Sequence, residues 1–413
     1  MADINNLRVN GDRLWASLMA MAKIGATDKG GCNRQALSDE DKAGRALFIE
    51  WCEAAGCTVR VDAIGNIFAR RPGRIAALPP VLAGSHLDTQ PTGGRFDGVY
   101  GVLAGLEVVR ALQDANVATE GPIDIVAWTN EEGARFAPAM LGSGVWAGVF
   151  DLDESYSITD RAGLRLGDEL DRIGFKGEMV QIDRPHAAFE VHIEQGPILE
   201  DAEQQIGIVT GVQGIRWYDL TITGQSCHAG TTPMELRRDP VRQVTTILAA
   251  LYALVDESRS GARVTFGEIS TKPASRNTVP EEVTVTVDLR HPNETELDGL
   301  ETALNNIVRS ANDASVSRLW SCDTIKFDAA CIEAVESSTL RLGYSHRRMV
   351  SGAGHDSVYV STVAPTSMIF IPCENGLSHT EIENAAPADI TAGCNVLLHA
   401  MLTRDSERKF IAR

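Results

Sequence analysis

The sequence predicts an α/β fold whose main domain is interrupted by a smaller α+β domain. Over the first half of the chain, apolar strand-like runs alternate with helical patterns, which is typical of a sheet with a largely parallel core. After Gly211 the pattern changes to half-exposed strands and long helices, and from about Cys331 the α/β pattern returns. A chain of 413 residues is long enough for two domains. We therefore expect a main domain of residues 1–212 and 330–413, with residues 213–329 inserted.

The elements of the main domain follow from residue spacing and from residues that begin or end helices. Apolar residues at helical spacing predict a helix within residues 5–25. Ser38, followed by three acidic residues, predicts a capped helix that runs to about Ala55 and ends at Gly56. We expect an amphipathic helix over residues 98–112, and strands at the following positions: 57–62, 66–70, 80–84 and 123–128.

The inserted domain shows a strand-helix-strand-strand-helix pattern. Its predicted helices are residues 239–256 and 293–312, and its predicted strands are residues 217–223, 263–267 and 283–289. This order suits a compact α+β domain. Beyond it, the sequence predicts a helix, a glycine-rich loop at residues 352–356, a strand at residues 367–371 and a final helix to about Leu402.

Composition excludes several classes of protein. The net charge of −18 repels phosphate backbones and anionic lipid surfaces, so we expect neither nucleic-acid nor membrane partners. The eight cysteines form no CxxC pair, which favours free thiols in a reducing cytosol. The polar N-terminus carries no signal-peptide pattern, and no apolar run is long enough to span a bilayer. The expected location is therefore cytoplasmic.

The most informative segment runs from Gly84 to Gly98 and places a histidine and a carboxylate in one glycine-rich loop after an apolar strand. Further histidines and carboxylates follow at other strand ends and loops. The candidate metal ligands are His86, Asp97, one of Glu131 and Glu132, His192 and His379. Any one of these segments is weak by itself, but their joint occurrence favours a two-metal hydrolase.

Spacing suggests separate roles for the acidic residues. Asp97 follows two glycines that would let the backbone approach closely, and a carboxylate can bridge two cations about 3.5–4 Å apart. Asp88 lies two residues beyond His86, so its carboxylate could accept the second imidazole N–H and orient the ring. Glu131 and Glu132 would point to opposite sides, one binding metal while the other takes a proton from water.

Two residues of the inserted domain also suggest chemistry. His228, followed by Ala-Gly, reads as a polar group that stabilises an oxyanion. A thiol nucleophile at Cys227 receives little weight, because adjacent residues rarely form a working Cys–His pair. Arg290, after a predicted strand, could pair bidentately with a substrate carboxylate or could equally be a surface arginine. His355, in its glycine-rich loop, could likewise be a functional residue or a structural one.

These segments resemble a known family, the hydantoinase/carbamoylase branch of the dizinc amidohydrolases related to aminoacylases and carboxypeptidase-like peptidases. Its members include N-carbamoyl-L-amino acid hydrolases, β-ureidopropionases and allantoate amidohydrolases. The resemblance covers nearly the whole chain, and the segments that carry it are Gly84–Gly98, Thr129–Phe136, His192–Pro197, His228–Gly230, Gly352–Asp356 and Ser378–His379. It implies a mixed-sheet, dinuclear-zinc peptidase-like catalytic domain with an inserted lid that also forms a homodimer interface.

The resemblance also implies a role for each site residue. One metal ion would be held by His86, Asp97 and His192, and the other by Asp97, Glu132 and His379, so that Asp97 bridges them. Glu131 would be the general base. His228 would stabilise the developing oxyanion in the active site of the partner subunit of a homodimer. The residues expected to bind a small-molecule carboxylate substrate are Gln195, Asn277, Arg290 and Gly354, with Asn277 and Arg290 on the carboxylate.

The expected reaction is cleavage of the ureido C–N bond of an N-carbamoyl-L-amino acid or N-carbamoyl-β-alanine. The chain departs from the family pattern at Cys373-Glu374-Asn375, where we expect Ser and a small or glycine-rich loop, and this departure bears on the substrate. An allantoate amidohydrolase is therefore an alternative. A catalytically silent binding protein would lack a ligand or the base, and a dinuclear aminopeptidase would not need Asn277 with Arg290. The ligand set accepts zinc, manganese, cobalt or nickel.

Overall fold

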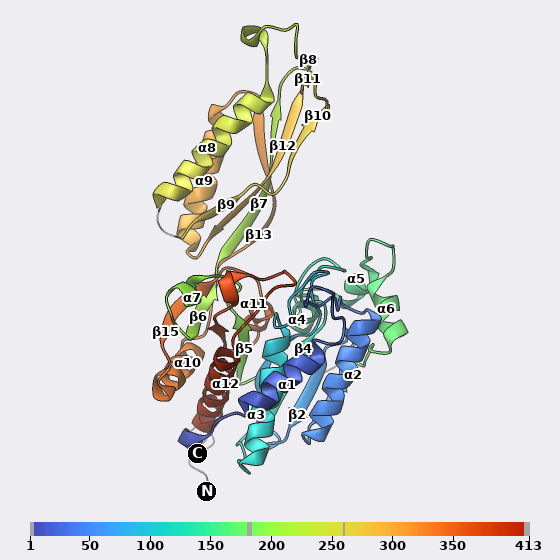
Figure 1. The fold of residues 1–413 in the computed structure, drawn as a ribbon, viewed down its shortest axis with the longest axis vertical. Helices are drawn as coiled ribbons and strands as arrows, with labels where there is room; N and C mark the ends of the chain where they lie inside the picture. The colour runs from blue at the N-terminus through green and yellow to red at the C-terminus, as the bar shows by residue number, and fades with distance from the viewer. Residues whose placement is uncertain (1–3, 180–183, 259–260, 409–413) are drawn as a thin grey trace. The chain divides into compact units, whose positions relative to one another are not determined.

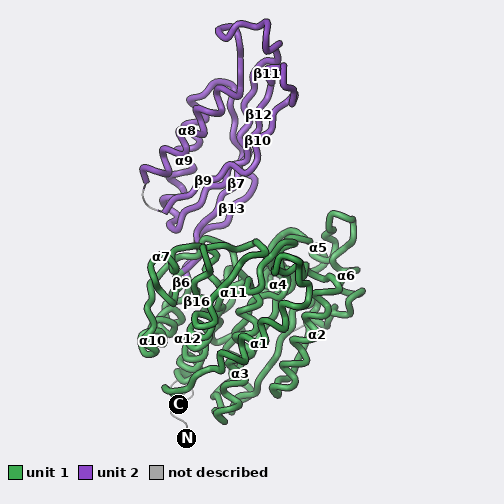
Figure 2. The backbone as a smooth tube through the Cα atoms, in the orientation of Figure 1, with its two compact units in different colours: residues 1–210, 327–413 green, residues 211–326 purple. Residues whose placement is uncertain are grey.

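The computed structural model describes residues 4–179, 184–258 and 261–408, and the chain divides into two compact units (Figure 2). The larger unit consists of Met1–Thr210 and Phe327–Arg413, and the smaller unit of Gly211–Lys326. The larger unit combines helices with a mixed sheet (Figure 1). The α/β class that the sequence predicts is therefore confirmed.

The large sheet has the strand order β1-β2-β4-β3-β5-β16-β6-β14, and β15 also pairs with β6. Its centre is parallel, because β3 pairs in parallel with β4 and β5, and β5 pairs in parallel with β16. The outer pairs β1–β2, β2–β4 and β16–β6 are antiparallel. The strands are β1 (Thr58–Val61), β2 (Ile67–Arg71), β3 (Val81–His86), β4 (Ile123–Trp128), β5 (Ala187–Ile193), β6 (Ile206–Val212), β14 (Ile325–Lys326), β15 (His346–Ser351) and β16 (Thr366–Ile371).

Both faces of this sheet are covered, which explains why its central strands are mainly apolar and buried at every position. Along β3, Val81 and Ala83 join the main hydrophobic core, whereas Leu82 joins a second cluster with Trp128 and Trp146 on the other face. The helices of the unit are α1 (Gly11–Met21), α2 (Asp39–Ala54), α3 (Val99–Asp114), α4 (Leu141–Trp146), α5 (Leu152–Ser157), α6 (Leu166–Ile173), α7 (Ile198–Asp201), α10 (Ala329–Leu342), α11 (Ser357–Val360) and α12 (Pro387–Glu407), with short 3₁₀ turns at Ile4–Asn6 and Glu374–Gly376.

Helix α3 differs from its sequence prediction. It is not amphipathic but buried on nearly every side, because it packs against β3 and β5 as well as against α1 and α12. Helix α2 agrees with its prediction: the Ser38 side chain accepts the N–H of Asp41, and Gly56 adopts a positive φ of 77° just after the helix.

The smaller unit is a five-stranded sheet with the order β10-β12-β7-β13, in which β9 also pairs with β12, together with two helices and a separate two-stranded ladder. Its core lies between the sheet and the helices. The elements are β7 (Gly214–Thr223), β8 (Cys227–His228), a 3₁₀ turn at Met234–Leu236, α8 (Pro240–Ser258), β9 (Arg263–Thr265), β10 (Ile269–Lys272), β11 (Thr278–Val279), β12 (Glu282–His291), α9 (Glu294–Ser310) and β13 (Ala314–Cys322).

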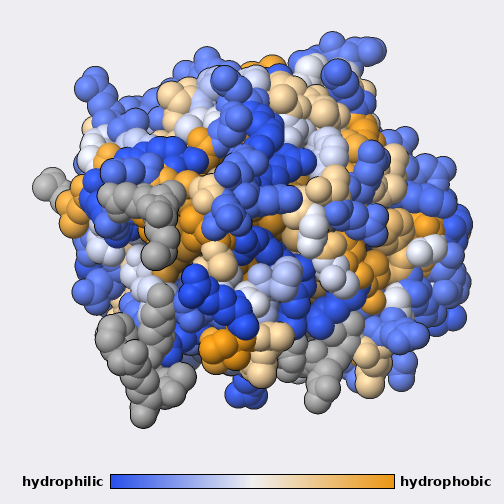
Figure 3. Space-filling model, turned by 90° about the horizontal axis from the view of Figure 1, so that it is seen from below, coloured by the Kyte–Doolittle hydropathy of each residue, from blue (hydrophilic) through white to orange (hydrophobic). Residues whose placement is uncertain are grey.

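Several strands are not among the predicted elements. The long edge strand β13 has mostly exposed side chains, so it carries no apolar run that would mark it in the sequence. The other strands additional to the prediction are β5, β6, β14 and β15 of the large sheet and β8, β10 and β11 of the smaller unit. Within the described part of the chain, no helix is both long and apolar enough to cross a membrane. The face drawn in Figure 3 is mainly hydrophilic, with hydrophobic residues scattered over it.

Candidate metal centre

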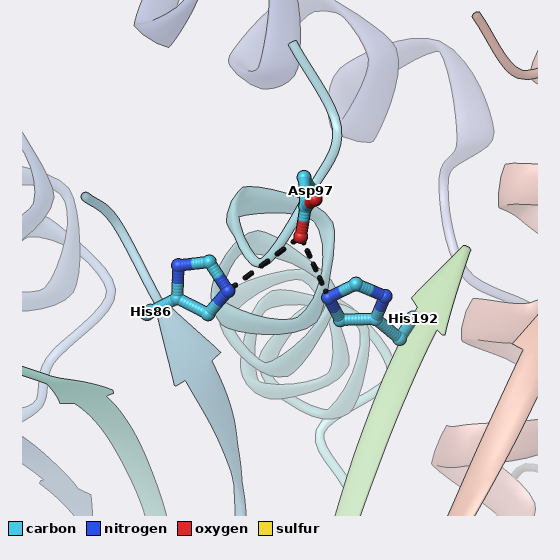
Figure 4. Close-up of side chains that lie close together, drawn as sticks. All are labelled: His86, Asp97 and His192. Atoms are coloured by element: carbon cyan, nitrogen blue, oxygen red, sulfur yellow. Dashed lines mark ion pairs between the residues drawn. The ribbon is translucent and has the colours of Figure 1, made fainter. Parts of the chain in front are cut away.

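The first group of potential metal ligands gathers at the carboxyl ends of the central parallel strands. His86 is the last residue of β3, His192 lies near the end of the adjacent β5, and Asp97 comes just before α3 (Figure 4). Oδ1 of Asp97 lies 3.6 Å from Nε2 of His86 and 3.1 Å from Nε2 of His192. All three side chains are buried and point toward one another. Adjacent parallel strands end at the same edge of a sheet, and this brings the two histidines together.

A second group uses the other oxygen of the same aspartate. Oδ2 of Asp97 lies 3.5 Å from Nε2 of His379, which in turn lies 3.5 Å from Oε2 of Glu132. Asp97 therefore presents one oxygen to each group, as a bridging carboxylate would. Imidazole nitrogens and carboxylate oxygens are ligands of zinc and related divalent ions, so the residues of both groups fit a metal centre.

Glu131 lies beside this centre rather than in either group of three. Its carboxylate is buried, and Oε2 is 3.4 Å from Nε2 of His86. Burial, followed by the negative charges of Asp356, Glu132 and other nearby carboxylates, raises the pKa of Glu131 well above its usual range. A carboxyl group that holds a proton easily at this position is suited to acid–base chemistry.

The carboxylates of the centre respond differently to the same burial. Burial and the charge of Asp97 raise the pKa of Glu132 well above its usual range. For Asp97, burial also opposes ionisation, but the hydrogen bond and charge of His192, together with His86 and His379, outweigh it and hold the pKa far below its usual range. Of these two carboxylates, Asp97 is thus the one whose negative charge is more stable.

Asp88 orients the centre through different atoms from those that the sequence suggested. Nδ1 of His86 contacts the backbone oxygen of Asp88 at 2.9 Å, whereas the nearer carboxylate oxygen lies 4.0 Å away. The carboxylate instead accepts the backbone N–H groups of Glu131 and Glu132, each at 3.2 Å. The difference arises because β3 ends at His86, so Asp88 is no longer in the strand alternation.

The glycines around Asp97 are required by close approach. At Gly98, which has a φ of 66°, a Cβ atom would lie 2.2 Å from Nε2 of His86. At Gly94, a Cβ atom would lie 2.0 Å from the carboxylate of Glu383. The close contact with the candidate ligand His86 is therefore made by the glycine after Asp97, and not by the two before it.

Three polar residues of the centre have no role in the sequence prediction. The side chain of Gln90 donates to Oε2 of Glu132 at 2.7 Å, while its backbone N–H lies 3.2 Å from Oε1. The hydroxyl of Ser378 lies 3.0 Å from Oδ2 of Asp97, and Glu383 lies just beyond it. Gln90 and Ser378 fall inside the motifs, whereas Glu383 follows the last motif by four residues, and its only sequence signal is the Glu-Ile-Glu run after His379.

Two of the expected substrate-binding residues belong to the larger unit. Nε2 of Gln195 donates to Oδ2 of Asp97 at 2.9 Å, and its Oε1 is buried without a hydrogen-bond partner in the described structure. Gly354 lies in the predicted loop before His355, and a Cβ there would contact Met140. The ring of His355 packs edge-on against His192, with centroids 4.6 Å apart, so His355 belongs to the wall of the centre.

Local contacts explain the loop at residues 373–375, where the sequence departs from the family pattern. Cys373 is fully buried, with its thiol directed at the backbone oxygen of Gly196, and burial raises its pKa to about 12. Glu374 accepts a hydrogen bond from Asn384, and Asn375 adopts a positive φ of 56°. These contacts fix the turn that leads to His379.

In the smaller unit, His228 occupies an exposed two-residue strand. Its Nδ1 accepts the backbone N–H groups of Gly230 and Thr231, at 3.0 and 3.2 Å. A neutral ring that accepts at Nδ1 carries its proton on Nε2, so His228 presents an N–H donor. Arg237 closes the same loop by donating to the backbone oxygens of Ala229 and Thr232.

The structure does not bring Asn277 and Arg290 together within one chain. Asn277 is next to the ladder of β8 and β11, which lies beyond the start of β12, whereas Arg290 is near the end of β12 (Figure 1). The eight residue-to-residue steps of extended strand from Glu282 to Arg290 span about 27 Å. The guanidinium of Arg290 is bound by Asp288, with Nη2 2.8 Å from Oδ2.

The centre and the fold define a metal-dependent hydrolase: two groups of His and carboxylate side chains that could hold metal ions share one aspartate at the edge of a mixed sheet, in a unit interrupted by an α+β insertion. The family model described as peptidase family M20/M25/M40 matches residues 82–403, and the chain belongs to this family.

Individual relatives agree over nearly the full length. The chain is 48% identical to an N-carbamoyl-L-amino-acid amidohydrolase of Rhizobium meliloti, over 96% of this chain and 97% of the relative. It is 31% identical to an allantoate amidohydrolase of Bacillus subtilis, over 91% and 93% of the two chains. A crystal structure of an amidase of the hydantoinase/carbamoylase family from Burkholderia multivorans superposes with a TM-score of 0.92 and 51% identity, covering 96% of this chain and 98% of that one. The resemblance drawn from the sequence motifs is confirmed.

Proposed function

We propose that this enzyme hydrolyses the ureido C–N bond of N-carbamoyl-L-amino acids, or of N-carbamoyl-β-alanine, to the amino acid, ammonia and carbon dioxide. The observation that carries the proposal is the bridging arrangement of Asp97, whose two oxygens face separate ligand groups, with Glu131 beside one of them. Similarity over nearly the whole chain to an enzyme named for this reaction supports the choice of substrate class.

The proposed cofactor is a pair of divalent cations, either zinc or one of manganese, cobalt and nickel. One would be held by His86, Asp97 and His192, and the other by Asp97, Glu132 and His379. When bound, such a pair lowers the pKa of a water molecule and polarises the carbonyl group of the substrate.

Glu131 is the proposed general base. Its raised pKa suits a group that takes a proton from the attacking water and then gives it to the leaving nitrogen. Attack at the ureido carbon and cleavage of a C–N bond release ammonia, and the remaining carbamate breaks down to carbon dioxide and the free amine. Asp88 holds the backbone of Glu131 and Glu132 in place through two accepted hydrogen bonds.

His228 is proposed to stabilise the oxyanion that forms during attack. Its Nε2–H is free to donate because Nδ1 already accepts two backbone N–H groups. Loss of one such donor costs about 2.7–4 kcal/mol in comparable sites. We propose that this histidine serves the active site of a partner subunit in a homodimer formed through the smaller unit, which would also act as a lid.

The substrate carboxylate is assigned to Arg290 and Asn277, and further substrate contacts to Gln195 and Gly354. The separation of Asn277 from Arg290 along β12 supports the homodimer, because one bound substrate could contact both only if two copies of the chain contributed. The free cysteines, of which six are buried, support a reducing cytoplasm as the location.

The test is ammonia release by metal-reconstituted protein with N-carbamoyl-L-amino acids, N-carbamoyl-β-alanine and allantoate. Preference for a carbamoyl amino acid supports the proposal and identifies the side-chain preference. Preference for allantoate would replace it with the alternative function, which the relative from Bacillus subtilis favours. No turnover of any of them by protein that holds both metals would favour a silent binding protein.

A further inference from the structure

We propose that Glu383 is a positioning residue that fixes the bridging Asp97 relative to the loop of His379, and so sets the affinity for the second metal ion. This inference rests on the proposed two-metal centre. It concerns a residue that binds neither metal nor substrate and that lies four residues beyond the last ligand.

The carboxylate of Glu383 joins two segments that are far apart in the chain. Its side chain is 1% exposed, and Oε1 accepts the backbone N–H groups of Phe96 and Asp97 at 3.0 and 3.1 Å. Its Oε2 lies 3.1 Å from the hydroxyl of Ser378, the residue before His379. One buried side chain thus holds the backbone of the bridging ligand and the segment that carries another ligand.

The hydroxyl of Ser378 extends this connection to the metal-facing oxygen. It lies 3.0 Å from Oδ2 of Asp97, the oxygen that faces His379. Gln195 donates to the same oxygen at 2.9 Å and lies 3.3 Å from the hydroxyl. Because a hydroxyl has one proton, Ser378 can donate to only one of the two carboxylates at a time, and both are within reach. Ser378 therefore links Glu383 to the oxygen of Asp97 that faces His379.

The chain makes room for this carboxylate with a glycine. A Cβ atom on Gly94 would lie 2.0 Å from both Cδ and Oε1 of Glu383. Gly94 is not among the glycines with positive φ, so it is the space, and not the backbone conformation, that excludes a side chain. Gly94, the second glycine of the Gly-Gly pair, therefore allows the carboxylate of Glu383 to occupy this position.

Removal of the carboxylate would leave the N–H groups of Phe96 and Asp97 buried and unpaired, which is costly enough for the segment to shift. Residues that orient metal ligands typically change metal affinity by about 10–100-fold when they are mutated. We expect the larger effect on the ion of the group containing Asp97, Glu132 and His379, because the Ser378–His379 segment serves that group alone, whereas Asp97 serves both groups.

The experiment titrates metal-stripped full-length protein with Mn²⁺ and follows the free ion by electron paramagnetic resonance, while circular dichroism monitors folding. The variants are E383A, E383Q and G94A, with E381Q as the matched control. Glu381 is a nearby carboxylate that pairs with Lys29 at 3.4 Å, and in the described part of the chain it forms no hydrogen bond or ion pair with Asp97 or Ser378. G94A displaces the carboxylate of Glu383 without removing it, so it remains informative if E383A does not fold.

Wild type and E381Q should bind two ions per chain, whereas E383A and G94A should keep the first and bind the second about 10–100-fold more weakly. E383Q should lie between, because its amide oxygen can still accept the two backbone N–H groups. Wild-type affinity in folded E383A and G94A, or an equal loss in E381Q, would overturn the inference and leave the two-metal proposal intact. A wild type that binds fewer than two ions would overturn both.

Discussion

Asp62 offers a quantitative test of how burial acts on a charged group away from the metal centre. Its carboxylate lies in the turn between β1 and β2, is 6% exposed, and accepts the backbone N–H and the side-chain amide of Asn66, each at 2.8 Å. Burial raises its pKa to about 6, although the hydrogen bonds from Asn66 act in the opposite direction. The perturbation is D62N, which keeps the shape and removes the charge.

The direction of the pH effect on the free energy of unfolding follows from whether the folded or the unfolded chain binds the proton of Asp62 more tightly. Below pH of about 4, Asp62 is protonated in both the folded and the unfolded chain. Between about 4 and 6 the unfolded chain releases the proton first, so the stabilising contribution of this group is lost as the pH rises through the folded pKa. A shift of about two pH units corresponds to about 3 kcal/mol. Because the unfolded carboxyl group is already about half ionised near pH 4, the free energy of unfolding of D62N minus that of wild type should rise by about 2 kcal/mol between pH 4 and pH 7.

The assay is equilibrium urea unfolding of metal-stripped protein at several pH values, followed by tryptophan fluorescence. Only the pH dependence of the difference matters, so any constant cost of replacing one carboxylate oxygen with an amide cancels. D28N is the matched control for the loss of one carboxylate charge, because Asp28 is exposed. A difference for D62N that stays flat or falls with rising pH would refute the reasoning about burial.

Four further outcomes are expected. E131Q should retain its metal content but lose about 10²–10⁴-fold in kcat, and a kcat near wild type would remove Glu131 as the base. R237M should lower kcat by about tenfold or more, because two hydrogen bonds from the charged Arg237 hold the His228 loop, and R237K should recover part of the lost kcat. Equal activity of wild type, R237M and R237K would count against a role of Arg237 in positioning His228. Chelation should lower the melting temperature, because a free metal at a thousand times its Kd adds about 4 kcal/mol to the free energy of unfolding. An unchanged melting temperature would contradict a bound metal. In folded protein, thiol reagents should modify Cys227 and Cys322 before the six buried cysteines, and rapid reaction of all eight would contradict the packing.

Local features of the sequence predicted about half of the helices and strands that the structure describes. The cap at Ser38, the helical end at Gly56 and the buried strand at β4 depend on neighbouring residues, and the structure agrees with each of them. The exposed edge strand β13 was not predictable in this way, because its pairing with β7, rather than its own side chains, makes it a strand. The buried character of α3 likewise arises from the elements packed around it.

The sequence by itself determined which residue types could hold metal, because the histidines and carboxylates stand in recognisable motifs at strand ends. The tertiary structure decided which oxygen of Asp97 faces which group, that the backbone rather than the carboxylate of Asp88 contacts His86, and that Glu383 reaches Asp97 across 286 positions. The physical reason is the range of the interactions. Periodicity and caps act between neighbours in the chain, whereas hydrogen bonds in the centre join atoms that meet only after the sheet has formed.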